Sequence, residues 1–215
     1  MVETTTGLVL RTRLLTETSL IVHWLTRDSG RLATVAKGAR RPKSPFLGKL
    51  DLFYRAEFTF TRSRRSELHT LRELSLQETH PGLRRDLGML QQAAYCAALV
   101  EQTTETDTPL PELFELFNDL LHHLRVSAES SVAVFAFELK LLNELGMQPD
   151  LEKTGLNDGT KQLIRKMQEE GWDELERLRL SAGQMKELKQ FLHGFLIYHL
   201  GKIPMGREAA LAGRP

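Results

Sequence analysis

The chain has 215 residues, 41% hydrophobic and 27% charged, which is typical of a soluble globular protein with one large or two small domains. Its formal net charge of +1 favours no class of partner. Its single cysteine, Cys96, excludes an intramolecular disulfide and a cysteine-based zinc site. The N-terminus lacks the regions of a signal peptide, and no apolar run approaches the roughly 18 residues of a membrane span, so we predict a cytoplasmic protein without membrane contact.

The first 80 residues predict a small β-barrel. Runs that alternate polar and apolar residues, or are rich in β-branched and aromatic residues, recur along this part of the chain. The turn-forming sequence at residues 27–30 predicts a hairpin. Five short strands in about 65 residues are typical of a closed barrel. The predicted strands are Leu8–Leu10, Ser19–Thr26, Arg31–Ala36, Tyr54–Thr61 and Glu67–Arg72.

A basic loop separates the third and fourth predicted strands. The stretch between Asp28 and Asp51 contains six Lys or Arg residues and no acidic residue. Such a loop on a rigid edge suits a polyanion, although it is also compatible with a solvated surface loop. Phe46, inside the loop, either packs against the barrel or stacks on a base. The residues expected to contact DNA are Lys37, Arg40, Arg41, Lys43 and Lys49, joined by Arg11, Arg31 and Arg72 if their strands bring them to the same face.

From residue 83 onward the sequence predicts helices. Apolar residues recur there at three- and four-residue spacing, and Ser181 has the character of an N-cap. Gly146 followed by Pro149 marks a helix end. The sequence therefore predicts an α+β fold with a barrel followed by an all-helical domain. The predicted helices are Leu83–Gln102, Pro111–Arg125, Ser130–Leu145, Thr160–Glu170 and Ser181–Leu200.

Charge is divided unequally between the two parts. Residues 1–80 hold 14 Lys and Arg against 8 Asp and Glu, whereas residues 81–215 hold 15 against 20. The stretch 101–119 has six acidic residues and no basic one, and it is expected to repel a DNA backbone. We therefore expect the first part to bind nucleic acid and the second part to bind proteins.

No motif predicts catalysis, a cofactor or a metal. The neighbouring His122 and His123 point about 100° apart on a helix and cannot share one ion. No glycine loop of the GxxxxGK[ST] type is present, so ATP is not expected. Cys96 lies in a predicted helix, where a lone cysteine is most often a small buried apolar residue. We therefore predict that the protein is not an enzyme.

Several segments, in a fixed order, match one known family. They are Leu8–Arg13, Glu17–Leu20, Asp28–Arg31, Ala36–Arg41 with Lys43, Ser44 and Gly48, Phe137–Gly146, and Tyr198–Lys202 with Arg207. On these segments the chain resembles RecO, the bacterial recombination mediator family, over nearly its whole length. The run from Glu17 to Gly48 is the most specific part of the resemblance.

The resemblance implies a DNA-binding OB-fold over residues 1–80 and a helical partner-binding domain over residues 81–215. Members of the family bind single- and double-stranded DNA, anneal strands coated with single-stranded-DNA-binding protein, and act with RecR so that RecA can replace that coat. The resemblance also implies that the protein acts in DNA repair and is associated with the nucleoid. The alternative is a protein-interaction adaptor whose basic loop binds an acidic protein surface. Many relatives hold zinc with four cysteines, but residues 150–160 contain neither Cys nor His, so the zinc module is expected to be absent.

The resemblance also implies a site for the C-terminal tail of single-stranded-DNA-binding protein. Such a tail combines a carboxylate with apolar residues, so its receptor needs an apolar groove beside a cation. The same apolar residues are also explained as ordinary helix-packing core. The candidate residues are Phe137, Lys140 and Leu141 on one helix, and Lys186, Lys189, Phe191 and Phe195 on the last helix.

Overall fold

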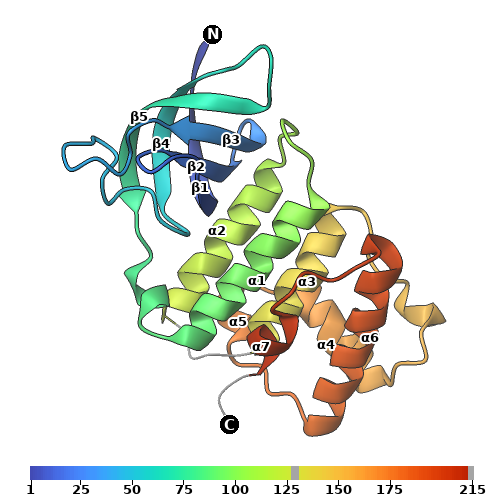
Figure 1. Cartoon of the computed structure of the whole chain (residues 1–215). Helices are drawn as coiled ribbons and strands as arrows, with labels where there is room; N and C mark the ends of the chain where they lie inside the picture. Colours follow the sequence, from blue (N-terminus) through green and yellow to red (C-terminus); the bar gives the residue numbers. More distant parts are fainter. Residues whose placement is uncertain (127–130, 213–215) are drawn as a thin grey trace. The chain divides into compact units, whose positions relative to one another are not determined.

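The computed structural model describes residues 1–126 and 131–212. Its contacts divide the chain into two compact units (Figure 1). The barrel unit comprises residues 1–80 and 104–115, and the helical unit comprises residues 81–103 and those from 116 onward. Residues 104–115 thus pack with the barrel, although they follow the first long helix in sequence.

The barrel unit is a closed five-stranded barrel in the order β1-β2-β3-β5-β4 (Figure 1). All neighbouring strands are antiparallel except β3 and β5, which run parallel. This arrangement confirms the predicted OB-fold. The strands are β1 (Val2–Leu14), β2 (Leu20–Thr26), β3 (Gly30–Ala36), β4 (Arg55–Thr61) and β5 (Leu68–Glu78).

The first strand is much longer than its sequence pattern predicts. Its first half pairs with β4 and its second half with β2, so one strand closes the barrel on both sides. The extension contains Thr4, Thr5 and Thr6, which are β-branched but carry no apolar alternation that would reveal a strand. Inside the barrel, Trp24 stacks on Phe58 with ring centroids 4.2 Å apart.

The helices match the five predicted ones and add short elements. Ser130, expected to begin the third helix, lies outside the described residues. Single turns such as α5 and α7 are too short to give a periodic pattern. None of the described helices is long and apolar enough to cross a membrane. The elements are η1 (Pro81–Arg84), α1 (Leu87–Thr103), α2 (Pro111–Val126), α3 (Ser131–Glu144), η2 (Leu151–Lys153), α4 (Asp158–Glu169), α5 (Trp172–Leu175), α6 (Ala182–Leu200) and α7 (Arg207–Leu211).

A buried ion pair joins three helices of the helical unit. Glu138 on α3 is fully buried and accepts two hydrogen bonds from Arg207 on α7, at 2.6 and 2.8 Å. The hydroxyl of Tyr95 on α1 donates a third, at 2.6 Å. Burial, reinforced by the charge of Glu138, raises the pKa of Tyr95 far above its usual value, so the hydroxyl keeps its proton. The carboxylate is therefore balanced by a cation and held by three donors.

Residues 104–108 lie along β3 of the barrel unit. Arg31 donates hydrogen bonds to the Thr104 carbonyl and hydroxyl, and the Asp107 amide donates to the Arg31 carbonyl at 2.9 Å. Gly30 has φ +66°, and a Cβ atom there would lie 2.1 Å from the carbonyl oxygen of Thr108. Glycine at this position therefore permits the close approach.

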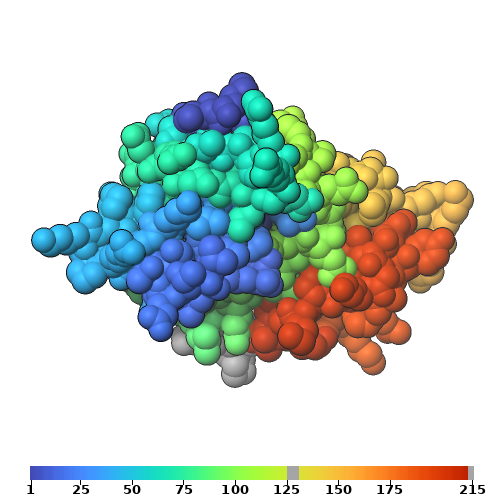
Figure 2. Space-filling view, turned by 45° about the horizontal axis from the view of Figure 1, so that its top comes forward, coloured from blue at the N-terminus to red at the C-terminus, as the bar shows by residue number. Residues whose placement is uncertain are grey.

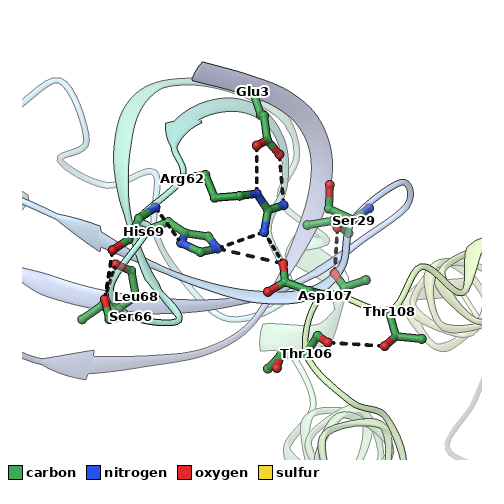
Figure 3. Close-up of polar contacts among 12 residues, drawn as sticks. Glu3, Ser29, Arg62, Ser66, Leu68, His69, Thr106, Asp107 and Thr108 are labelled. Atoms are coloured by element: carbon green, nitrogen blue, oxygen red, sulfur yellow. Dashed lines mark hydrogen bonds and ion pairs between the residues drawn. The ribbon is translucent and has the colours of Figure 1, made fainter. Parts of the chain in front are cut away.

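An arginine at the end of β4 fixes the same segment (Figure 3). The Arg62 guanidinium binds both carboxylate oxygens of Glu3, at 2.8 and 3.0 Å, and one of Asp107 at 2.5 Å. A second acidic residue, Glu115, pairs with Arg27 at 3.2 Å. The sequence predicts that the acidic stretch repels DNA as part of the helical domain, and this stays a prediction. In the structure two of its carboxylates pair with arginines of the barrel unit, because residues 104–115 belong to that unit.

Candidate nucleic-acid interface

The basic loop is anchored to the barrel by two buried side chains. Ala39 and Phe46 belong to the barrel core, and Phe46 is only 7% exposed. Phe46 therefore packs against the barrel in this structure instead of lying open for a base. Between and beside these anchors the loop folds into successive turns, with Gly38 and Gly48 at positive φ.

The cationic side chains of this loop point toward solvent. Lys37, Arg40, Arg41 and Lys43 are exposed, and Lys49 is half-buried. The light-blue segment that projects from the barrel unit in Figure 2 contains them. The base of the loop is tied to the turn between β1 and β2, where the Arg40 amide donates to the Thr18 carbonyl and its guanidinium to the Glu17 carbonyl. A fixed backbone thus presents a cluster of positive charge.

The three arginines expected to join the basic loop in binding DNA do not all lie together. Arg11 and Arg31 line one pocket of about 300 Å³ together with His23. The sequence alone predicts no role in DNA binding for His23. Arg72 does not line this pocket, and it donates a hydrogen bond to the Thr61 hydroxyl at 2.8 Å. The signal that could have identified His23 is its alternation with Ile21 on a predicted strand, which places both on one face.

The two candidate partner sites differ in accessibility. Phe137 and Leu141 on α3 are buried in the core, and Lys140 donates to the carbonyls of Gln168 and Glu170 at 3.0 and 2.8 Å. Lys140 thus ties α3 to the end of α4, and the two buried apolar side chains do not form an exposed groove. The hypothesis of a groove on α3 is thus at odds with the packing, since the apolar side chains face inward.

The candidate partner-binding lysines on the last long helix, α6, are more accessible. Lys186 and Lys189 line a pocket of about 380 Å³ between α6 and α7. Lys189 forms an ion pair with Glu208 at 2.5 Å, which lowers the pKa of that carboxyl. Phe191 and Phe195 are partly buried and pack against the helical core. The remaining lining residues are Gln190, His193, Arg207 and Glu208.

Residues 150–160 are held by polar contacts. The Asp150 side chain caps η2, and Asn157 caps α4 by accepting from the Thr160 amide at 2.9 Å. Glu187 on α6 accepts from both Asn157 and Thr160. Within residues 1–126 and 131–212, no group of three or more His, Cys, Asp or Glu side chains is placed to hold a metal ion.

Cys96 has the environment of a structural residue. It is fully buried on α1, and burial raises the pKa of its thiol well above the usual value. A thiol in this state is a poor nucleophile, because the thiolate is the reactive form. The side chain is therefore a buried residue of the helical core whose thiol keeps its proton.

Two family models match the chain in the order of its two units. The model described as Recombination protein O N terminal matches residues 1–80, and the one described as Recombination protein O C terminal matches residues 84–157 and 152–208. The chain belongs to the RecO family. The first match coincides with the barrel strands and the basic loop, so the family assignment and the OB-fold refer to the same residues.

Curated relatives agree with this RecO assignment. The chain is 34% identical over 151 residues to a protein from Exiguobacterium sibiricum and 34% identical over 145 residues to one from Bacillus subtilis, each named DNA repair protein RecO. A third relative of that name, from Rhodopirellula baltica, is 34% identical over 147 residues. These matches cover 70%, 67% and 68% of this chain. They span 60%, 56% and 54% of the relatives' own lengths.

Proposed function

We propose that this RecO-family chain is a DNA-binding recombination mediator in DNA repair. In this role the barrel unit binds single- and double-stranded DNA. The protein anneals strands coated with single-stranded-DNA-binding protein and, with RecR, promotes the loading of RecA, without catalysing a chemical step. It acts in the cytoplasm at the nucleoid. The observation that carries the proposal is the exposed basic loop, fixed to an OB-fold barrel by Ala39 and Phe46.

The geometry favours recognition of the DNA backbone. Lysine and arginine side chains that neutralise phosphates release condensed counterions, which supplies affinity for any sequence. OB-folds that bind single strands usually add affinity by stacking bases on exposed rings. Trp24, Phe46, Phe58 and Phe60 are all buried in this barrel. We therefore expect binding that depends strongly on salt and weakly on sequence.

Binding of labelled single-stranded DNA at several salt concentrations tests this function. If about four side chains meet phosphates, log K should fall against log salt with a slope near −3, from a factor of about 0.7 per contact. Duplex DNA should give a steeper slope for the same number of contacts. A protein that binds neither form at low salt would instead be an adaptor whose loop recognises an acidic protein surface.

For the helical unit we propose binding of the acidic, apolar tail of single-stranded-DNA-binding protein at α6. The supporting observation is the pocket of about 380 Å³ that Lys186 and Lys189 line on α6. Phe191 and Phe195 pack against the helical core and do not line this pocket. A tail peptide should bind with a low-micromolar Kd, about −8 kcal/mol. Lys186→Glu should weaken this binding and leave the affinity for naked DNA nearly unchanged. Lys166→Glu on α4, another exposed lysine, is the matched control. Equal peptide affinities for both variants would place the tail elsewhere.

A further inference from the structure

The outer surface of β1, β2 and β3 forms a second polar site on the barrel unit. The strand register places His23 of β2 between Arg11 of β1 and Ala33 of β3. Because side chains alternate along strands, Arg31 lies on the same face as Ala33. The pocket there has a volume of about 300 Å³. Its other lining residues are Trp24, Leu32, Glu67 and Thr106.

One of the charges at this pocket, that of Arg31, is held in place. The Arg31 guanidinium makes three hydrogen bonds to Thr104, at 2.6 to 3.2 Å, so its position is fixed before a ligand arrives. Burial and the nearby Arg11, Arg13 and Arg31 lower the pKa of His23 to about 4. His23 is therefore neutral at pH 7 and carries one N–H donor. Several arginines around a partly enclosed hollow give a positive potential, which Glu67 reduces.

We propose that this pocket holds one backbone phosphate of a single DNA strand whose neighbouring phosphates lie on the basic loop. The inference rests on the proposed DNA-binding function and names a second contact for the same strand. Guanidinium groups match phosphate oxygens in shape and charge, and the small side chain of Ala33 leaves room for the backbone to approach. Glu67 stands at the same pocket and opposes an anion.

The pocket and the basic loop are consecutive along one strand. Ala33 and Lys37, where the loop begins, are four positions apart, and an extended strand covers about 13 Å over that distance. A single nucleic-acid strand can therefore contact both sites without bending around the barrel. This continuity is the reason for assigning the pocket to a polymer and not to an isolated phosphate group.

Two substitutions test the pocket while leaving the loop intact. Arg11→Gln removes a charge, and Ala33→Leu fills the pocket without altering charge. Each should weaken binding of a labelled oligothymidylate of about 20 nucleotides roughly tenfold at low salt, and Arg11→Gln should reduce the salt slope by about 0.7. Arg177→Gln, an exposed arginine of the helical unit, controls for net charge. Circular dichroism and the Tm show whether each variant folds.

Removal of the opposing carboxylate should have the reverse effect. Glu67→Gln should strengthen binding about threefold, more than Glu73→Gln, which removes an exposed carboxylate of β5 outside the pocket. Equal effects of the two variants would show that only net charge matters, which contradicts a phosphate in the pocket.

The ring of His23 reports on occupancy directly. Three charged groups act on it, Arg11 and Arg13 from β1 and Arg31 from β3, and Glu67 from the turn before β5 lines the same pocket. A phosphate beside the imidazole favours its protonated form, so the His23 pKa measured by NMR should rise when the oligothymidylate binds. Loss of the basic loop's charges should weaken this change but not reverse its direction.

The outcomes separate the two proposals. If the wild-type protein binds no DNA, the proposed function fails. If it binds DNA and both Arg11→Gln and Ala33→Leu behave like Arg177→Gln, only the pocket assignment fails. Thymidine 5′-monophosphate and inorganic phosphate serve as further probes. If either raises the His23 pKa while the oligothymidylate does not, the pocket binds a small anion and the inference is wrong.

Discussion

The barrel unit and the helical unit use arginine in opposite ways. Arg40 and Arg41 stand exposed on a loop, whereas Arg207 is 4% exposed and paired with a fully buried Glu138. Exposed charges change stability little when they are replaced, but a buried charge that loses its partner is costly. Arginine thus supplies exposed charge for the proposed DNA binding in one unit and a buried ion pair in the other. The two roles can be separated by measuring DNA affinity and stability on the same variants.

The largest effect on stability is expected at the buried pair. Glu138→Gln leaves the Arg207 guanidinium without a counterion inside the helical core, and it should lower the free energy of unfolding by about 3–5 kcal/mol. Chemical denaturation measures this loss. Glu144→Gln, an exposed glutamate at the end of the same helix, is the control. A double variant, Glu138→Gln with Arg207→Met, should recover part of the stability, and failure to do so would contradict an electrostatic origin.

Substitutions in the basic loop should instead weaken DNA binding and leave the free energy of unfolding nearly unchanged. Replacing Arg40, Arg41 and Lys43 with Ala should weaken single-stranded DNA binding roughly a hundredfold at 0.1 M salt and reduce the salt slope by about 2. Stability should change by less than about 0.5 kcal/mol per site, because these side chains are exposed. The matched control replaces Lys161, Arg165 and Lys166 on α4. An unchanged DNA affinity in the loop variant would refute the site.

Gly30 tests how residues 104–108 attach to the barrel. Gly30→Ala places a methyl group against the Thr108 backbone at positive φ, so it should cost about 1–3 kcal/mol. Gly48→Ala, also at positive φ but with open space around it, keeps the backbone strain and lacks the clash. The difference between the two Tm values measures the contact with residues 104–108. Equal values would show that this contact contributes nothing.

The barrel unit should lose stability in mild acid through His23. Its folded pKa of about 4 lies below the usual 6.5, so the unfolded state binds more protons between these values. Stability is therefore complete above about pH 6.5 and falls as the pH drops toward 4. His23→Gln should flatten this part of the pH profile. His193→Gln, which replaces an exposed histidine of the helical unit, is the matched control.

Chelation should have no effect on stability. Residues 150–160 contain neither Cys nor His and are held by caps and by Glu187. EDTA should therefore leave the Tm unchanged, and elemental analysis should find no tightly bound zinc. One equivalent of retained zinc would contradict this prediction.

The strands, the long helices and the basic loop could be predicted because each follows from a local pattern. Alternation identifies the strands, three- and four-residue spacing identifies the helices, and the run without acidic residues identifies the loop. The Glu138–Arg207 pair could not be predicted, since its partners lie 69 residues apart. The inward position of Phe46 also depends on the closed barrel, and Phe137 and Leu141 lie inside because neighbouring elements cover α3.

The attachment of residues 104–108 to β3 affects how a barrel of this kind avoids aggregation. β3 and β5 pair only at Ala33, Thr34 and Val35, so the first half of β3 would expose backbone groups to other chains. Thr106 and Asp107 cover that edge. A fragment that stops at residue 80 would contain every strand yet leave this edge open for intermolecular pairing. The edge of the barrel is thus completed by a peptide that follows the first long helix in sequence, and the ribosome must release that peptide before the edge is covered.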